Sequence, residues 1–183
     1  ILEVKSGLAK SDEVLTCVPF IKFYKNTVTV IGAKPGTGKT AFILSSALKQ
    51  AEKGYKVMVI SLEMTSDRLT ARVIQTKTQI FAKRLISGEI TNEEYDTVKD
   101  LNLSENVLID EGIGVNSQNF KTRLVSLYKK YRFDVCYIDY FQKIPMVGKG
   151  SSVDLQFNLM ETQICAFAKE NSVAMCVLSQ LTR

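Results

Sequence analysis

The sequence predicts an α/β fold with a mainly parallel central sheet and helices on both of its faces. Three observations lead to this prediction. Short apolar runs alternate along the chain with longer amphipathic segments, as in βαβ units whose strands are joined by crossovers. Most of the runs contain several consecutive apolar residues, as expected for buried strands of a parallel sheet. Polar residues follow several of these runs, at the carboxyl ends where such sheets bind ligands.

Five strands are expected, each a short apolar run with many β-branched residues. The first run leads directly into a loop rich in Gly and Pro. The opening of the chain is polar and mixed, and no element is predicted there. In chain order, the expected strands cover residues 26–32, 57–61, 107–110, 133–139 and 173–179.

Helices are expected between the strands, because the intervening segments carry amphipathic patterns with capping signals. Gly54 suits a C-cap position, and Thr65 or Ser66 can cap the second helix. A further helical stretch is interrupted at Ser87-Gly88, and Thr91-Asn-Glu-Glu94 then has the form of a capping box. The longer helices are expected at residues 40–53, 65–78, about 116 or 117 to 131, and about 153 to 170.

Composition favours one compact domain. The 183 residues are 45% hydrophobic and 23% charged, enough to bury a core without disulfides or metals. No run approaches the roughly 18 apolar residues that span a bilayer, and no signal peptide is recognisable, so we expect a cytoplasmic protein without a membrane partner. Because the chain opens at Ile1 and stops at Arg183, just after the last expected strand, we expect residues 1–183 to be a single domain cut from a longer protein.

Cysteine usage and charge narrow the function classes. The chain has no histidine and no close cysteine pair, so neither a zinc site nor a redox dithiol is predicted. A net charge of +5 and a pI near 9.0 suit an acidic partner such as nucleic acid, without identifying one. The cysteines, expected as core fillers, are Cys17, Cys136, Cys165 and Cys176.

A phosphate-binding loop is predicted after the first strand. In the pattern G-x-x-x-x-G-K-[ST], backbone N–H groups at a helix N-terminus cradle phosphate oxygens. Here alanine replaces the first glycine, which the bend tolerates if its φ is negative. We expect Lys39 to contact the β- and γ-phosphates of a nucleoside triphosphate and Thr40 to hold Mg²⁺. The residues of the loop are Ala33, Lys34, Pro35, Gly36, Thr37, Gly38, Lys39 and Thr40.

Acidic and amide side chains at other strand ends complete the predicted site. Asp139 ends an apolar run, as a Walker B acid does beside a P-loop, and is expected to serve the metal. Glu63 lies two residues beyond the second strand and is well placed to polarise an attacking water. Asp110 and Glu111, after the third strand, compete for that role. Gln180, after the fifth strand, could hydrogen-bond the γ-phosphate or the water.

Three further runs resemble the RecA-like motor domain of DnaB-type replicative helicases. The family commonly carries alanine at the first P-loop position, so Ala33 supports the resemblance, which extends over nearly the whole chain. Arg72 matches an arginine of the family, but pairing with a carboxylate is an equally good account of it. The runs are Ser61-Leu-Glu-Met64, Ile138-Asp-Tyr-Phe-Gln142 and Leu178-Ser-Gln-Leu-Thr-Arg183.

The resemblance implies an ATP-hydrolysing helicase of bacterial, phage or plasmid origin. Lys39 and Thr40 would bind the phosphates and Mg²⁺, and Asp139 would serve the metal. Glu63 would activate water, and Gln180 would sense the γ-phosphate. The family also implies a homohexameric ring with ATP between subunits and single-stranded DNA in its channel, with primase and a helicase loader as further partners. The neighbour's arginine finger follows the fifth strand in such rings, so none is assigned in this chain.

Residues 143–152 are the candidate DNA contact, because loops after the fourth and fifth strands face the channel in RecA-like motors. Lys143 and Lys149, with Gly148 and Gly150, would suit a mobile loop that tracks phosphates. An ordinary solvated loop is the alternative.

Two other functions compete with a helicase. One is a RecA- or RadA-like recombination or repair ATPase. The other is a helicase loader or regulator in which ATP acts as a switch and no unwinding occurs. The Ser-Leu-Glu-Met and Ile-Asp-Tyr-x-Gln runs favour a motor that couples ATP hydrolysis to translocation on single-stranded DNA and unwinding of duplex DNA.

Overall fold

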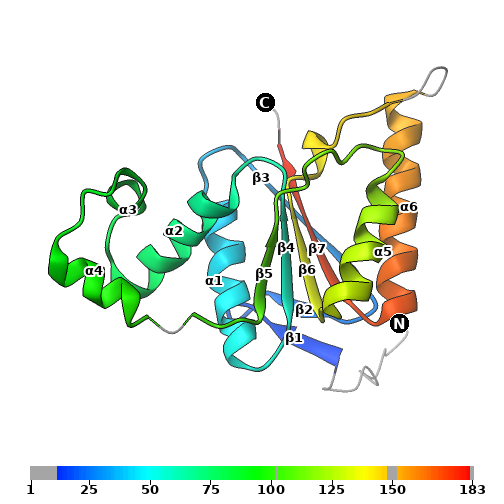
Figure 1. The fold of residues 1–183 in the computed structure, drawn as a ribbon. Coiled ribbons are helices and arrows are strands. Elements are labelled where there is room, and N and C mark those ends of the chain that lie inside the picture. Colours follow the sequence, from blue (N-terminus) through cyan, green and yellow to red (C-terminus); the bar gives the residue numbers. More distant parts are fainter. Residues whose placement is uncertain (1–11, 102, 148–151, 182–183) are drawn as a thin grey trace.

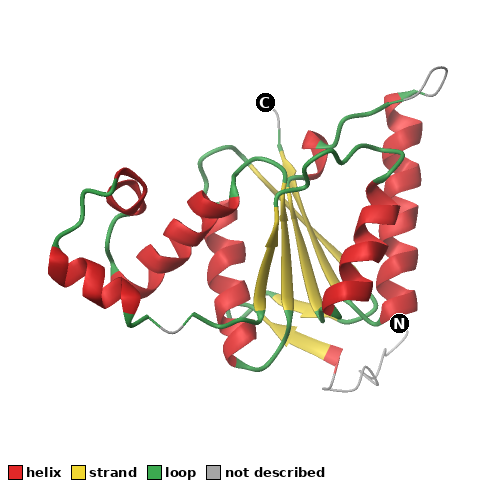
Figure 2. Ribbon diagram, in the orientation of Figure 1, coloured by secondary structure: helices red, strands yellow, loops and turns green. Residues whose placement is uncertain are grey.

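The computed structural model describes residues 12–101, 103–147 and 152–181 (Figure 1). A five-stranded sheet lies at its centre, in the order β3-β7-β6-β4-β5, and every neighbouring pair in it is parallel. Helices cover both faces (Figure 2), so the predicted fold class is confirmed. The strands are β3 (Val28–Ala33), β4 (Val57–Ser61), β5 (Val107–Asp110), β6 (Val135–Asp139) and β7 (Ala174–Gln180).

The helices form two layers. In Figure 1, α1 and α2 lie on one side of the sheet, and α5 and α6 lie on the other. A short 3-10 helix, η2 (Phe141–Lys143), follows β6. Within the described residues, no helix is both long and apolar enough to cross a lipid bilayer. The α-helices are α1 (Lys39–Glu52), α2 (Ser66–Thr78), α3 (Ala82–Ser87), α4 (Asn92–Lys99), α5 (Phe120–Tyr131) and α6 (Val153–Asn171).

Successive side chains of a strand point to opposite sides of a sheet. Because helices cover both sides here, the central strands are buried on both faces. On β4, Val57 and Val59 pack in the cluster that contains α1, whereas Met58 and Ile60 pack in the cluster that contains α5 and α6. Each of these side chains is at most 1% exposed. Burying one contributes about 1.5–3 kcal/mol, so the sheet is a firm base for the residues at its carboxyl edge.

A two-stranded hairpin at the start of the described chain was not predicted. Strands β1 (Glu13–Leu15) and β2 (Lys22–Tyr24) pair antiparallel, and Val14 and Phe23 are fully buried. Phe23 packs edge-on against Tyr137 of β6, with ring centroids 5.8 Å apart. Each strand contributes one buried residue, which is too short a pattern to detect as an alternation.

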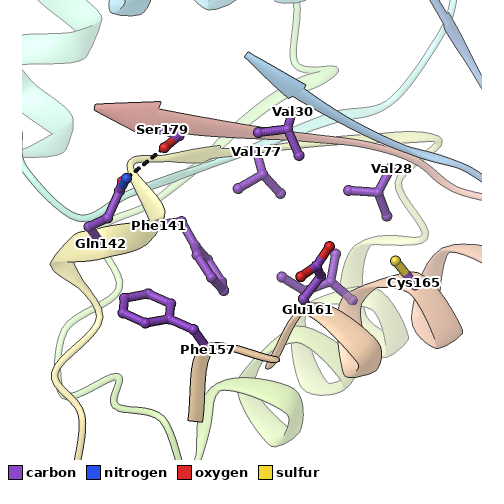
Figure 3. Close-up of a pocket in the computed structure, with 10 residues that line it drawn as sticks. Val28, Val30, Phe141, Gln142, Phe157, Glu161, Cys165, Val177 and Ser179 are labelled. Carbon is purple, nitrogen blue, oxygen red and sulfur yellow. Dashed lines mark hydrogen bonds between the residues drawn. The ribbon is translucent and has the colours of Figure 1, made fainter. Parts of the chain in front are cut away.

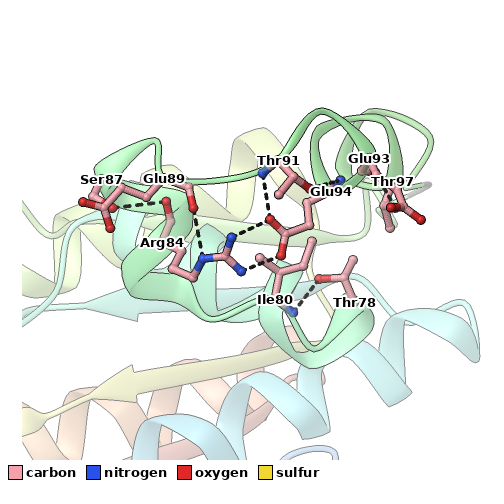
Figure 4. A network of polar contacts seen from close by, with 9 residues as sticks. All are labelled: Thr78, Ile80, Arg84, Ser87, Glu89, Thr91, Glu93, Glu94 and Thr97. Carbon is pink, nitrogen blue, oxygen red and sulfur yellow. Dashed lines mark hydrogen bonds and ion pairs between the residues drawn. The ribbon is translucent and has the colours of Figure 1, made fainter.

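Helices α3 and α4 form an arm beside α2 that is held largely by polar contacts (Figure 4). Neither helix has a buried residue. The guanidinium of Arg84 donates two hydrogen bonds of 2.5 and 2.7 Å to the carboxylate of Glu94. The capping box predicted at Thr91 and Glu94 is confirmed, and the predicted break at Gly88 is the left-handed C-cap of α3.

Most predicted boundaries agree with the structure to within two residues, and α5 is the main exception. It begins at Phe120 rather than near residue 116. The side-chain oxygen of Asn116 accepts hydrogen bonds from the backbone N–H groups of Gln118 and Asn119. Asn116 therefore caps a turn that precedes the helix instead of the helix itself.

Candidate nucleotide-binding site

A cavity of about 550 Å³ opens at the carboxyl edge of the sheet, a size typical of small-ligand sites. It brings together five residues that the sequence predicted to act together: Lys39, Thr40, Glu63, Asp139 and Gln180. They come from the start of α1, the loop after β4 and the ends of β6 and β7. The remaining lining residues are Pro35, Gly36, Gly38, Ala41, Met64, Arg68 and Arg72.

The loop between β3 and α1 contains two glycines in left-handed conformations, which can form an anion-binding concavity of backbone N–H groups. Gly36 and Gly38 have φ values of 74° and 92°, a region that side chains disfavour. The first turn of α1 contains no acidic residue, which leaves its N–H groups and helix dipole available to an anion. The ammonium group of Lys39 donates to the carbonyl oxygens of Ala33 and Lys34 at 3.0 and 3.1 Å, so it already lies against the loop.

Ala33 occupies the end of β3, where the general motif has glycine. Its φ is not among the positive values of the described residues, so alanine satisfies the condition set for this position. Its register partner on β7 is Gln180, and its carbonyl oxygen accepts from the N–H of Leu181 at 3.1 Å. The strand pairing therefore fixes the phosphate loop relative to the end of β7.

Thr40 and Asp139 meet in the floor of the cavity. The Thr40 hydroxyl donates to Oδ2 of Asp139 at 2.8 Å, and Asp139 is only 2% exposed. Burial raises the pKa of Asp139, while the hydrogen bond from Thr40 opposes the rise. A carboxylate held in a desolvated position beside a hydroxyl offers the hard oxygen ligands that Mg²⁺ prefers.

Glu63 is held in the cavity by the turn after β4. The hydroxyl of Ser61 donates to the carbonyl of Met64 at 2.7 Å and accepts from the N–H of Met64 at 3.1 Å. The N–H of Leu62 donates to the carbonyl of Asp139 at 2.7 Å, which ties this turn to β6. Glu63 itself is exposed and forms no side-chain hydrogen bond with any residue that the structure describes. Its carboxylate is therefore available to a ligand.

The two acids that competed with Glu63 are engaged elsewhere. Asp110 forms an ion pair with Arg123 of α5, including a contact of 3.3 Å from Nε. Glu111 accepts from the backbone N–H and hydroxyl of Ser66 at 2.7 and 2.6 Å, and this bonding lowers its pKa. Neither acid lines the cavity. The arrangement favours Glu63 as the water-activating group, a role that stays a prediction.

Two arginines of α2 line the same cavity. Burial raises the pKa of Asp139, and the positive charge of Arg72 acts in the opposite direction. Arg68 is not among the residues predicted from the sequence, although it precedes Arg72 by four residues and so shares its helix face. The cavity thus contains positive charge from Lys39, Arg68 and Arg72 beside the carboxylates of Glu63 and Asp139.

No described residue of the candidate DNA contact lines this cavity. Lys143 belongs to η2, is exposed, and places its ammonium 5.7 Å from the centre of the Tyr140 ring. Lys149 lies outside the described residues, so its predicted role has no structural counterpart.

The sequence matches the model of one protein family, described as DnaB-like helicase C-terminal domain, over residues 4–183. It is 28% identical over 193 residues to a probable replicative DNA helicase of Guillardia theta, a match covering 100% of this chain and 32% of the relative. It is 30% identical over 168 residues to the replicative DNA helicase DnaC of Bacillus subtilis, covering 88% of this chain and 37% of that one. The chain therefore spans less than two-fifths of the length of these relatives.

Solved structures confirm the predicted RecA-like fold. One solved ATPase domain superposes with a TM-score of 0.74 at 24% identity, over 87% of this chain and 59% of that one. A DnaB-like replicative helicase, solved to study its interactions with primase, gives a TM-score of 0.72 at 23% identity, over 87% of this chain and 41% of that one.

Proposed function

The chain belongs to the family of DnaB-like helicase C-terminal domains, and we propose that it is the ATP-hydrolysing motor domain of a replicative DNA helicase. One observation carries the proposal. A phosphate loop, an exposed glutamate, a buried aspartate and a strand-end glutamine line a single cavity. These are the parts that phosphoryl transfer to water needs.

Nucleotide binding rests on the loop of residues 33–40. In the proposal the N–H groups of this loop cradle the phosphates, and Lys39 moves from its carbonyl partners to phosphate oxygens. Thr40 and Asp139 would hold Mg²⁺, which when bound would neutralise phosphate charge. The fit is supported by the desolvated carboxylate of Asp139 beside the Thr40 hydroxyl, since a buried anion is stabilised by a cation.

Hydrolysis is assigned to Glu63 acting on a water molecule. Glu63 accepts a proton as the water oxygen bonds to the γ-phosphorus, and the bond to the β–γ bridging oxygen breaks to release ADP. Gln180 donates a hydrogen bond to the γ-phosphate, and Arg68 contributes positive charge at the rim. Such positioning and charge neutralisation account for most of the catalysis in enzymes of this class.

Membership of the family supports a proposal for assembly and DNA contact. We propose one ATPase domain within a longer, cytoplasmic protein of bacterial, phage or plasmid origin. Six copies would form a ring around single-stranded DNA, and primase and a helicase loader would be further partners. The net charge of +5 and the exposed Lys143 support contact with nucleic acid.

The proposal is tested by ATP hydrolysis of the full-length protein, measured with and without single-stranded DNA. A motor should hydrolyse ATP faster when DNA is added. Bound ATP with slow hydrolysis that DNA leaves unchanged would contradict the proposal and would instead fit a nucleotide-switched loader or regulator.

A further inference from the structure

The sheet splits at its carboxyl edge, next to the nucleotide cavity. Pairing between β6 and β7 ends at Ile138 and Val177. The pairings on either side of this one extend further: β4 and β6 are paired as far as Asp139, and β3 and β7 as far as Gln180. Asp139 and Gln180 therefore lie on the ends of β6 and β7, beyond the last residues that pair these two strands.

Gln142 of η2 bridges this split with its side-chain amide. Its Nε2 donates to the hydroxyl of Ser179 at 2.6 Å and to the carbonyl oxygen of Gln180 at 3.4 Å. Its Oε1 accepts from the N–H of Gln180 at 3.2 Å. Figure 3 shows the amide of Gln142 turned toward Ser179. A single side chain thus bonds both backbone groups of Gln180, as a neighbouring strand would.

The segment that carries Gln142 is itself packed as a unit. Phe141 lies against Phe120 and Phe157, with ring centroids 6.4 and 5.5 Å away. Ile144 is only 2% exposed. A displacement of η2 would therefore carry its neighbours with it, including the exposed Lys143.

Gln142 contacts the backbone of Gln180 rather than its side chain. Gln142 bonds the backbone groups, so the side-chain amide of Gln180 stays free to face the cavity that it lines. Gln142 does not line that cavity. A movement of Gln180 toward a bound phosphate would reach Gln142 through these backbone hydrogen bonds, without any contact between Gln142 and the nucleotide.

We propose that Gln142 is a positioning residue that couples the nucleotide state at Gln180 to residues 143–147, the start of the candidate DNA contact. This inference rests on the proposed function and names how the two sites communicate. In the ATP state Gln180 and η2 shift together, and after hydrolysis both return.

Hydrogen exchange of the full-length protein tests the coupling without DNA. The exchange rates of the backbone amides of residues 140–147 are measured with the non-hydrolysable ATP analogue AMP-PNP and again with ADP, and the two sets of rates are compared. In the unmodified protein we expect the exchange rates to differ about threefold or more between the two nucleotides. In Gln142→Met we expect the rates with the two nucleotides to be equal. Methionine keeps the length of the side chain but cannot form the three hydrogen bonds. Protection of the phosphate loop by nucleotide should remain, which a general loss of structure would not allow.

Gln118→Met is the matched control. Gln118 is exposed, and its side chain forms no hydrogen bond with any described residue, so this variant should keep the nucleotide-dependent difference. Should Gln142→Met fail to fold, Ser179→Ala removes only the shortest of the three bonds and should reduce the difference. An unchanged difference in Gln142→Met, or in Ser179→Ala if that variant is needed, would overturn the inference.

A double variant separates coupling from an independent structural effect. If Gln142 acts through Gln180, then Gln142→Met added to Gln180→Ala should lower DNA-stimulated hydrolysis no further than Gln180→Ala alone. A further multiplicative loss would overturn the inference. An unmodified protein whose hydrolysis responds to DNA, but whose residues 140–147 exchange equally with both nucleotides, would also overturn it and leave the proposed function standing.

Discussion

The hydroxyl of Thr40 donates a hydrogen bond of 2.8 Å to Oδ2 of Asp139, joining residues 99 positions apart in the chain. The contact links the first turn of α1 to the end of β6 at the floor of the nucleotide cavity. It places the hydroxyl and the carboxylate proposed for Mg²⁺ within reach of one ion.

Removing the Thr40 hydroxyl should weaken magnesium-dependent nucleotide binding. Thr40→Val keeps the shape of the side chain but removes a metal ligand, so we expect ATP affinity in the presence of Mg²⁺ to fall roughly 10–100-fold. The measurement is ATP affinity titrated against Mg²⁺. Thr97 is an exposed threonine of α4, and among the described residues its hydroxyl bonds only the carbonyl of Glu93. Thr97→Val should therefore bind ATP as the unmodified protein does. Equal magnesium dependence in both variants would argue against this site.

Exchanging Glu63 for glutamine should stop hydrolysis and spare binding. The amide keeps the size of the side chain but cannot accept the proton of the attacking water, so turnover should fall about 10²–10⁴-fold. ATP affinity and the single-turnover rate are the two measurements needed.

Glu111→Gln is the variant to compare with Glu63→Gln, because the sequence alone also allowed Glu111 as the water-activating residue. Its carboxylate caps α2 through Ser66, so its loss should lower stability with little loss of turnover per folded molecule. A larger loss of turnover in Glu111→Gln than in Glu63→Gln would reverse the assignment.

Lysines after β6 should contribute to DNA affinity. Lys143→Ala combined with Lys149→Ala removes two positive charges, so binding to single-stranded DNA at low salt should weaken and the slope of log affinity against log salt should decrease by roughly 1.4. ATP binding should be nearly unchanged. Lys169→Ala, in the last turn of α6, is the control for a general effect of charge. Unchanged DNA affinity at low salt would reject the contact.

Acid should loosen the α3–α4 arm. The hydrogen bonds from Arg84 hold the pKa of Glu94 below its ordinary value of 4.5. Stabilisation by the ionised carboxylate is therefore complete above 4.5 and is lost as the pH falls through the lowered value. Hydrogen exchange of residues 82–99, corrected for the intrinsic effect of pH, should show this loss.

Arg84→Met should weaken that pH dependence, because it removes the partner responsible for the shift. Lys83→Met, a neighbour on the same helix, should retain it. The same pH dependence in both variants would show that the Arg84–Glu94 pair does not cause the acid sensitivity of α3 and α4.

The sequence was sufficient for features whose signals are local. The sheet and the phosphate loop could be predicted because apolar runs and the Gly-Lys-Thr pattern are contiguous. The β1–β2 hairpin could not, since its strands each bury a single side chain. Spacing alone left Glu111 as an alternative to Glu63, and only the family resemblance favoured Glu63. The hydrogen bonds from Ser66 that engage Glu111 are tertiary contacts, which no spacing reveals. The bridge from Gln142 to Gln180 depends on where two strands part, which is set by packing across the whole sheet.

Strand displacement by the full-length protein tests the central claim most directly. With ATP and Mg²⁺ the unmodified protein, assembled as a ring whose mass is measured in the same sample, should release one strand of a forked DNA duplex. Without nucleotide, or with Glu63→Gln, the duplex should remain intact. An assembled protein that hydrolyses ATP in the presence of DNA but never displaces a strand would contradict the account.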